Sequence, residues 1–550
     1  MDRKTLIGFL LIGLILLLWP TYLELLSPSK PQEKATNETV VVEDIIEKYS
    51  GESAKKDVSP NVNIEVVETT VNGGLYSAKV SSLGGGSIVS FEIKDHLKKS
   101  EASLNLVDRS NEENLVISFI DQSGDVVVLD KGWVYSGPEK HTLSEENPST
   151  SLLYQKTVLG KRVTKKLIFN HNSYVVTVET SLREIKDLTL DQKYTISWIG
   201  GLPQTEGSQD AMFMEGLISQ AGSIDSYRVG SAGLFGGSSL DIERDSKQYV
   251  GQSEFVGYRT KYFGIFFVPQ KSDLVEITKY STNKRVGVDL GVVQDINFEK
   301  TDLFFGPLDY SAVSSLGVGL EKKILGWQWL SSVSWLVYTI MIFLHGLVPN
   351  YGVVVVLFAI LIKLVTYPLM AKQLRSSKKM QEISPELNRI KTKYKNNPTL
   401  QQQKIAALFQ QNKINPLAGC LPLLIQMPVL MAVFLVFRNT IEFRGESFLL
   451  WINDLSAADT LFYVGSIPVN ILPFLMSISM YYTMKMSTAS QPAGGDPAQE
   501  ATQQMMKYMF PGMMFFLFYS FPSGLNLYYF CFNLMQIAQQ KIINNEPKQK

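Results

Sequence analysis

A lysine inside an apolar stretch is the residue of this chain whose position carries the most chemistry. Lys363 is the single charged residue between Tyr351 and Met370. A run of about 20 apolar residues is long enough to cross a bilayer. A charge within such a span costs about 2.5–3.5 kcal/mol and usually faces a protein interior or a water-filled cavity. We therefore expect a polar site at membrane depth; the alternative is that the flexible side chain lifts its ammonium to the interface.

Other chemistry-bearing residues are sparse. The chain has two cysteines, Cys420 and Cys531, both in apolar stretches, and four scattered histidines. No pair of histidines has metal-ligand spacing, and no nucleotide-binding or hydrolase motif occurs in a suitable context. The predicted spans also lack a Ser/His or paired-Asp arrangement. The sequence thus predicts no catalytic residue, no metal and no cofactor, which argues against a membrane enzyme such as an intramembrane protease.

The 550 residues have a formal net charge of zero, but polarity is strongly segregated along the chain. Residues 60–320 show the apolar-polar alternation of half-buried strands, as in Tyr76, Ala78 and Val80. Short runs of this kind, separated by Gly, Asn, Asp and Ser, predict a large external β-sandwich domain. We interpret Gly84-Gly85-Gly86 as a turn at a strand edge.

The N-terminal 26 residues combine Arg3 and Lys4 with an apolar run, which predicts a membrane anchor over 1–26. A cleaved signal peptide is the alternative, although no small-residue cleavage site follows the run. Residues 27–59 are rich in Lys, Glu, Thr and Ser and predict a flexible linker.

Four further apolar segments follow the Lys363 span, which gives six predicted transmembrane helices with the anchor included. They are Leu417 to Phe437, Ser466 to Met484, Tyr508 to Phe521 and Ser523 to Ile537, the last two joined by a tight turn at Phe521-Pro522-Ser523-Gly524. Between Lys372 and Lys413 lie ten Lys or Arg and two acids, whereas Asn439 to Gly465 has one Arg and four acids. The positive-inside rule places the first loop in the cytoplasm and the second outside.

Two segments flank the predicted core helices. Residues 321–348 are predicted to form an amphipathic helix in the outer interface. A membrane crossing there would place the basic loop 372–413 outside, against the positive-inside rule. Residues 372–416 are predicted to form a cytoplasmic helical hairpin whose first helix begins at Ser384-Pro385-Glu386 and whose turn is Asn396-Asn397-Pro398. Its basic surface could be a solvated retention signal, a contact for anionic lipid, or a docking surface for RNA or a ribosome.

Four motifs resemble the YidC/Oxa1/Alb3 family of membrane-protein insertases, and most closely its Gram-negative bacterial members. They are Tyr367-Pro368-Leu369, the run from Asn415 to Pro428, Leu450-Trp451-Ile452-Asn453-Asp454-Leu455-Ser456 and the run from Phe521 to Tyr529. The resemblance covers about residues 325–542. It implies five core helices within 349–545 around a hydrophilic groove that opens to the cytoplasm and to lipid, in a multi-pass inner-membrane protein with cytoplasmic termini and a periplasmic domain.

The resemblance also implies site residues and partners. Lys363 stands where the family usually has an Arg, and Ala359 where it has a Thr. The positions on the substrate path are Lys363, Gln426, Met427, Pro428, Tyr528 and Tyr529. The implied partners are nascent membrane proteins, the Sec translocon, membrane lipids and, through the basic hairpin 372–413, the ribosome. A secondary transporter of a small anionic solute is the alternative function, because transporters also use intramembrane cations and broken helices.

Overall fold

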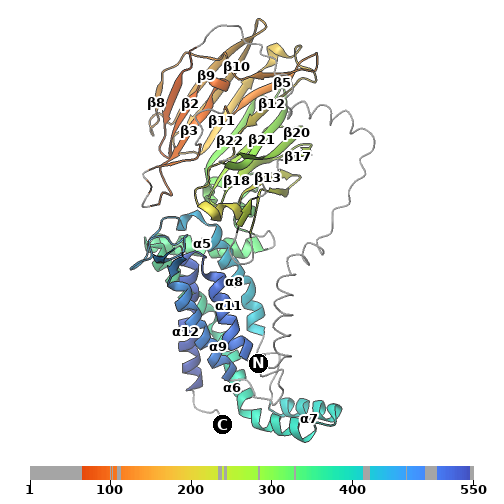
Figure 1. The fold of residues 1–550 in the computed structure, drawn as a ribbon, viewed down its shortest axis with the longest axis vertical. Coiled ribbons are helices and arrows are strands. Elements are labelled where there is room, and N and C mark those ends of the chain that lie inside the picture. Colours follow the sequence, from red (N-terminus) through yellow and green to blue (C-terminus); the bar gives the residue numbers. More distant parts are fainter. Residues whose placement is uncertain are drawn as a thin grey trace. The chain divides into compact units, whose positions relative to one another are not determined.

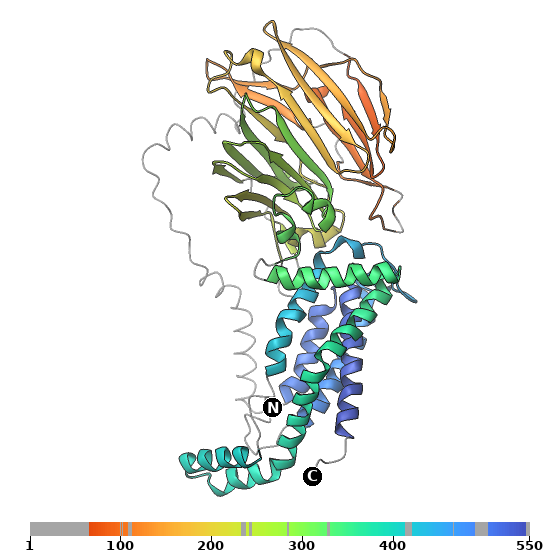
Figure 2. The same cartoon turned by 180° about the vertical axis from the view of Figure 1, so that it is seen from behind.

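The computed structural model describes residues 65–98, 101, 103–107, 113–232, 238–240, 245–282, 285–326, 330–412, 421–465, 467–489 and 504–545. The predicted anchor 1–26 and linker 27–59 lie outside these residues. The described chain divides into two compact units with the boundary between Ile324 and Leu325. One unit is rich in β-sheets and the other consists mainly of helices (Figures 1 and 2).

The β unit contains three sheets of five or more strands. The five-stranded sheet has the order β4-β3-β2-β1-β8, the nine-stranded sheet β14-β13-β18-β19-β22-β11-β10-β9-β7, and the six-stranded sheet β17-β20-β21-β12-β5-β6. The strands are β1 (Glu68–Asn72), β2 (Tyr76–Ser81), β3 (Ser87–Ile93), β4 (Leu104–Asn105), β5 (Val116–Ile120), β6 (Val126–Leu129), β7 (Val134–Tyr135), β8 (Lys140–Thr142), β9 (Ser149–Val158), β10 (Lys161–Asn170), β11 (Val175–Ser181), β12 (Lys193–Trp198), β13 (Glu215–Gln220), β14 (Ser223–Arg228), β17 (Asp245–Val250), β18 (Phe255–Arg259), β19 (Phe263–Pro269), β20 (Leu274–Thr282), β21 (Arg285–Asp295) and β22 (Lys300–Pro307). A small pair, β15 (Gly230–Ala232) and β16 (Ser238–Leu240), and the short helices α3 (Tyr310–Ser314) and α4 (Glu321–Ile324) complete the unit.

Side chains from different sheets meet in the core of this unit. The ring of Phe305 on β22 lies 5.1 Å from Trp198 on β12 and 4.7 Å from Phe91 on β3, measured between centroids. Along β9 and β10 buried residues alternate with exposed or half-buried ones, as expected for strands with one face on a core. The prediction of a β-rich domain from alternating residues is therefore confirmed.

The triple glycine forms a turn between β2 and β3, as predicted. Gly84, Gly85 and Gly86 all have positive φ, at 61°, 71° and 103°, a region that favours glycine. A Cβ on Gly86 would lie 2.7 Å from the ring of Tyr154, so the turn also needs glycine for close packing. Beneath it, the fully buried Lys165 donates hydrogen bonds to the backbone oxygens of Gly84 and Leu115. Burial lowers the pKa of Lys165 to about 7.

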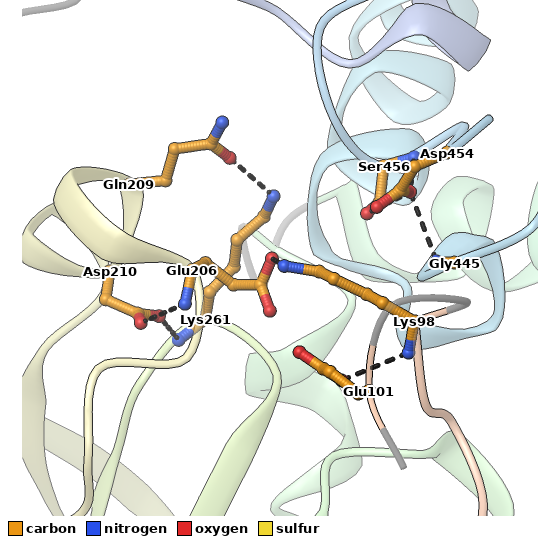
Figure 3. A network of polar contacts seen from close by, with 9 residues as sticks. All are labelled: Lys98, Glu101, Glu206, Gln209, Asp210, Lys261, Gly445, Asp454 and Ser456. Atoms are coloured by element: carbon orange, nitrogen blue, oxygen red, sulfur yellow. Dashed lines mark hydrogen bonds and ion pairs between the residues drawn. The ribbon is translucent and has the colours of Figure 1, made fainter. Parts of the chain in front are cut away.

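A polar network ties loops of the β unit together (Figure 3). The Lys98 ammonium lies 2.8 Å from the Glu206 carboxylate. The buried Asp210 carboxylate accepts from the backbone N–H of Glu206 at 2.8 Å and of Lys261 at 3.0 Å. Burial raises the Asp210 pKa, against the lowering effect of these two bonds. These contacts pair the Asp210 and Glu206 carboxylates with donors of the same unit, which indicates that the network has a structural role.

The second unit consists of helices α5 (Ser331–Leu347), α6 (Tyr351–Lys393), α7 (Pro398–Gln411), α8 (Leu421–Asn439), α9 (Leu472–Ala489), α11 (Phe510–Phe518, preceded by a π-helical turn over Met505–Met509) and α12 (Ser523–Asn544). Helix α5 runs across one end of the bundle (Figure 2), with Val337 and Met341 buried and Phe343 and Leu347 exposed. By length and composition, Tyr351–Met380 is the one described helix long and apolar enough to cross a membrane. Shorter apolar helices cover Ser331–Leu347, Pro428–Asn439 and Met505–Phe518.

Helix α6 corrects one prediction. It continues from Tyr351 through Pro368 and Pro385 to Lys393, so no helix begins at Ser384-Pro385-Glu386. An interior proline costs a helix about 3 kcal/mol. The continuous helix keeps Ile383, Leu387 and Ile390 on one stripe that packs against Leu408 of α7, and burial of this stripe offsets that cost. The predicted turn before Pro398 is confirmed, since the Asn397 side chain caps α7 by accepting from Leu400 N–H at 3.1 Å.

The loop between α8 and α9 is held by the motif that includes Asp454. One Asp454 carboxylate oxygen accepts from the backbone N–H of Gly445 at 3.1 Å and of Ser456 at 2.8 Å (Figure 3). The backbone N–H of Ser523 bonds to the oxygen of Ala457 at 2.7 Å, which fixes the start of α12 against this loop. The predicted turn between the last two apolar segments is confirmed, because α11 ends at Phe518 and α12 begins at Ser523.

Candidate functional site

Lys363 points into the helical bundle. Its side chain is 6% exposed, and its ammonium donates a hydrogen bond to the Oε1 atom of Gln536 on α12. The same nitrogen lies 4.4 Å from the ring centroid of Phe532, one turn earlier on α12, where a cation–π contact is favourable. In the structure the ammonium is therefore directed at α12.

No carboxylate in the neighbouring helices balances this charge. The sequences of α8, α9, α11 and α12 contain neither Asp nor Glu. Among the ion pairs of the described residues, none involves Lys363. An amide oxygen and an aromatic face share the ammonium without neutralising it. The site thus keeps a net positive charge that a carboxylate could meet.

A layer of buried polar side chains lies along α12, the helix that the lysine contacts. Asn526, Asn533, Gln536 and Gln540 fall on one side of α12 and are each at most 7% exposed. Asn533 donates to the hydroxyl of Ser479 on α9 at 3.3 Å. Ser479 and Thr483 are one turn apart and both buried. The polar layer therefore joins α6, α9 and α12 within an otherwise apolar bundle.

Several polar oxygens in this layer have no hydrogen-bond partner among the described residues. They are the side-chain carbonyl oxygens of Asn526, Gln539 and Gln540. Buried polar atoms are normally paired with protein groups or with water. Buried acceptors of this kind can hold donors such as water or a backbone N–H of a polar chain segment.

The predicted site residues do not all gather around the lysine. Tyr528 is 1% exposed and packs between α6 and α8, with its ring centroid 5.9 Å from Phe358 and 6.1 Å from Phe437. Tyr529 lies against Phe518 of α11 at 5.2 Å. Both tyrosines contribute to the helix packing.

The other predicted positions lie on α8. Pro428 lies inside that helix and is half-buried. Gln426 and Met427 fall within α8, but their side chains lie outside the described residues.

Sequence reasoning missed the residues that contact Lys363. Phe532 and Gln536 sit inside a predicted span without being singled out. A signal was present, because Asn526, Asn533, Gln536 and Gln540 are 7, 10 and 14 residues apart from the first of them. At 3.6 residues per turn, these spacings keep all four residues on one side of a helix, and a polar stripe in an apolar helix points toward a polar interior.

Comparison with known proteins assigns the chain to a family. The family described as "60Kd inner membrane protein" matches residues 343–550, and the one described as "YidC periplasmic domain" matches residues 68–338. A relative from Chloroherpeton thalassium named "Membrane protein insertase YidC" is 33% identical over 99% of this chain and 96% of its own length. The chain belongs to the YidC family of membrane protein insertases.

A second YidC relative, from Chlorobaculum parvum, is 30% identical over 99% of this chain and 94% of its own length. The similar solved structures include an α-galactosidase from Lactobacillus brevis at 9% identity, with 48% of this chain and 42% of that chain covered. Its TM-score of 0.27 is too low to support any inference about function.

Membership of the YidC family settles the function class predicted from the four motifs. The chain is an inner-membrane insertase with a periplasmic domain and is not an enzyme. The alternative of a secondary transporter finds no support among these relatives.

Proposed function

We propose that the chain moves polar segments of nascent membrane proteins across the inner membrane along the polar layer around Lys363. Crossing bare hydrocarbon is costly because each unpaired backbone polar group costs several kcal/mol. A path lined by amides and hydroxyls shortens the dry distance. The single observation that carries this proposal is a buried ammonium whose hydrogen-bond partner on α12 is a neutral amide oxygen, with no carboxylate in the neighbouring helices α8, α9, α11 and α12.

Lys363 supplies a transient counter-charge in this mechanism. A substrate segment with a carboxylate would replace Gln536 at the ammonium, because a charged acceptor bonds more strongly than a neutral one. Gln536 and Phe532 would take the ammonium back once the segment has passed. No bond is made or broken, so the substrate gains only a lower barrier.

The substrate path is proposed to run along α6, α8 and α12. Gln426, Met427, Pro428, Tyr528 and Tyr529 are its remaining members, with Gln426 offering hydrogen bonds. Met427 and the aromatic rings would offer an adaptable apolar side along which a substrate helix slides into lipid. The buried position of Tyr528 supports a role in supporting the helices that line the path.

The proposed topology has six membrane spans. Residues 1–26 form the anchor, 27–59 the linker, 60–320 the periplasmic domain, 321–348 the interfacial helix and 349–545 the five-helix core with the hairpin 372–416. Both termini lie in the cytoplasm. The support is the charge difference between the loops at the two ends of α8 and the position of α5 across the bundle end.

Three partners beyond the nascent chain are proposed. The basic hairpin of α6 and α7 would contact the ribosome, since most of its cations lie outside its small apolar core. Exposed apolar residues of α5, such as Phe343 and Leu347, would contact lipid. The Sec translocon would receive or deliver substrates laterally.

The test compares two small substrates that differ only in an acidic or a neutral outer tail, inserted into proteoliposomes. We expect Lys363→Ala to slow insertion of the acidic substrate about three- to tenfold, because a hydrogen bond to a charged group contributes about 1.5–3 kcal/mol and water replaces part of it. Lys363→Arg keeps the charge and is expected to be mild. Lys485→Ala, which removes an exposed cation of α9, is the matched control. Equal losses for both substrates would refute the charge role.

A further inference from the structure

The hairpin that precedes α9 exposes apolar side chains on both of its faces. Its strands are β23 (Thr460–Val464) and β24 (Ile467–Asn470). Successive residues of a strand point to opposite faces, yet all of the following are exposed: Leu461 at 47%, Phe462 at 51%, Tyr463 at 67%, Val464 at 62% and Ile467 at 64%. Large contiguous apolar surface of this kind marks an interaction site.

The base of the hairpin is firmly held. The Thr460 hydroxyl donates to the side chain of Asn470 at 2.7 Å, and Asn470 donates to the backbone oxygen of Tyr519 at 2.6 Å. The buried Asp459 carboxylate accepts from the backbone N–H groups of Ile471 and Leu472 at 3.0 and 2.6 Å. The exposed apolar residues are therefore presented by a fixed element of the helical unit.

The hairpin and most of the helix that follows it are free of charged residues. No Asp, Glu, Lys or Arg occurs from Thr460 to Met484. The following helix α9 exposes Phe474, Ile478 and Tyr482, four residues apart on one stripe. The turn at Leu449 and Leu450 adds two more exposed leucines, at 62% and 87%. The exposed apolar surface thus continues from the hairpin onto the helix that follows it.

We propose that this hairpin, residues 460–470, inserts into the outer leaflet of the bilayer at the boundary between headgroups and acyl chains. A flat protein partner would cover one face of a two-stranded sheet, whereas a fluid lipid phase surrounds both. The proposal rests on the proposed function, in which α9 crosses the membrane.

The backbone of the hairpin fixes its depth. In a two-stranded sheet the outer edge of each strand has no strand partner, and such edges do not occur in the hydrocarbon core. The headgroup region supplies water to those edges, and aromatic residues such as Phe462 and Tyr463 accumulate there. The hairpin is therefore a shallow anchor that tethers the start of α9 to the lipid.

Site-directed spin labelling tests this placement in the full chain. Cys420 and Cys531 are replaced by Ala, and a single cysteine is introduced as Tyr463→Cys, with Asn453→Cys as the control and Ile478→Cys as the reference on α9. Asn453 is exposed in the same loop but polar. The protein is placed in vesicles of phosphatidylethanolamine and phosphatidylglycerol, and collisions with oxygen and with a water-soluble nickel chelate are measured.

We expect the label at position 463 to meet the nickel chelate several-fold less often than the label at 453, and oxygen more often. Equal values at 463 and 453 would overturn the proposal. A label at 463 shielded from both reagents would indicate a protein cover, such as a second copy of the chain, and would also overturn it. A water-like label at 478 would instead contradict the membrane crossing of α9, and the result at 463 would still decide where the hairpin lies.

Discussion

Gln536 is the residue that gives the buried Lys363 ammonium a hydrogen-bond partner. Its amide oxygen accepts from the Lys363 ammonium, and the two residues lie on different helices. A neutral acceptor holds the ammonium in place and leaves its charge available. In the proposed mechanism, the side chain at position 536 sets the balance between holding the lysine and releasing it to a substrate.

A carboxylate at position 536 should pair with the Lys363 ammonium and keep it from pairing with an acidic substrate. We expect Gln536→Glu to slow insertion of acidic-tailed substrates about as much as Lys363→Ala, because the built-in acid forms the pair that the substrate would form. Neutral-tailed substrates should be far less affected. The measurement is the same proteoliposome insertion assay.

Gln536→Met is the matched control for Gln536→Glu. Methionine has a side chain of similar length but carries no negative charge. It should preserve the difference between acidic and neutral substrates. If Gln536→Glu inserted acidic substrates at the parent rate, Lys363 would not act through a carboxylate.

Lys165 gives a second prediction at this scale, in the β domain. Its folded-state pKa of about 7 lies below its ordinary value of 10.5. Between these values the unfolded chain binds one proton more than the folded chain, so the free energy of unfolding rises with pH. Below about pH 7 both states are protonated, and the cost of burying the ammonium is fully present.

We expect the parent to gain about 1–3 kcal/mol of β-domain stability between about pH 7 and pH 9 relative to Lys165→Met. Pulse proteolysis in urea on the intact protein in detergent measures this difference. Parallel pH profiles for the two proteins would mean that the ammonium is not carried into a dry core.

At the scale of elements, the triple-glycine turn combines a backbone and a packing requirement. Gly86 has a positive φ and a Cβ site only 2.7 Å from Tyr154. Gly160 has a similar φ of 79°, but nothing lies within 4 Å of its Cβ site. The two glycines therefore separate the cost of backbone conformation from the cost of crowding.

We expect Gly160→Ala to cost about 1–2 kcal/mol, the price of a left-handed backbone. Gly86→Ala should cost about 1–3 kcal/mol more, because overpacking of a core is added. Urea unfolding followed by pulse proteolysis compares the two variants. Equal losses would show that Tyr154 moves aside freely and that the turn needs glycine for its backbone alone.

For the molecule as a whole, the direction of the chain through the membrane is the property on which the mechanism depends. The basic hairpin and the acidic loop lie at opposite ends of α8 in sequence and carry opposite charge balances. The predicted topology requires the two loops to face different compartments.

Labelling of single cysteines in cells tests this topology. With the native cysteines removed, Asn453→Cys should react with a membrane-impermeant maleimide in spheroplasts, whereas Lys393→Cys, near Lys391 in the hairpin, should react only after the membrane is permeabilised. Both positions are exposed. Labelling of position 393 from outside would break the proposed orientation of every span.

The sequence by itself determined the composition of the two units and the family. Alternation of apolar residues predicted the strands, long apolar runs predicted the helices, and four motifs pointed to the insertase family. The local pattern also gave the glycine turn and the turn between α11 and α12. It failed at Pro385, where a local helix-start signal was outweighed by an apolar stripe that packs on α7.

Only the tertiary structure decided what Lys363 contacts. Gln536 lies 173 residues further along the chain, and no local pattern fixes a pairing across such a distance. The charge itself was visible because an ion in an apolar run is costly wherever the chain goes. Its partners depend on how α6 and α12 rotate against each other, which is set by the packing of residues such as Phe358 and Tyr528.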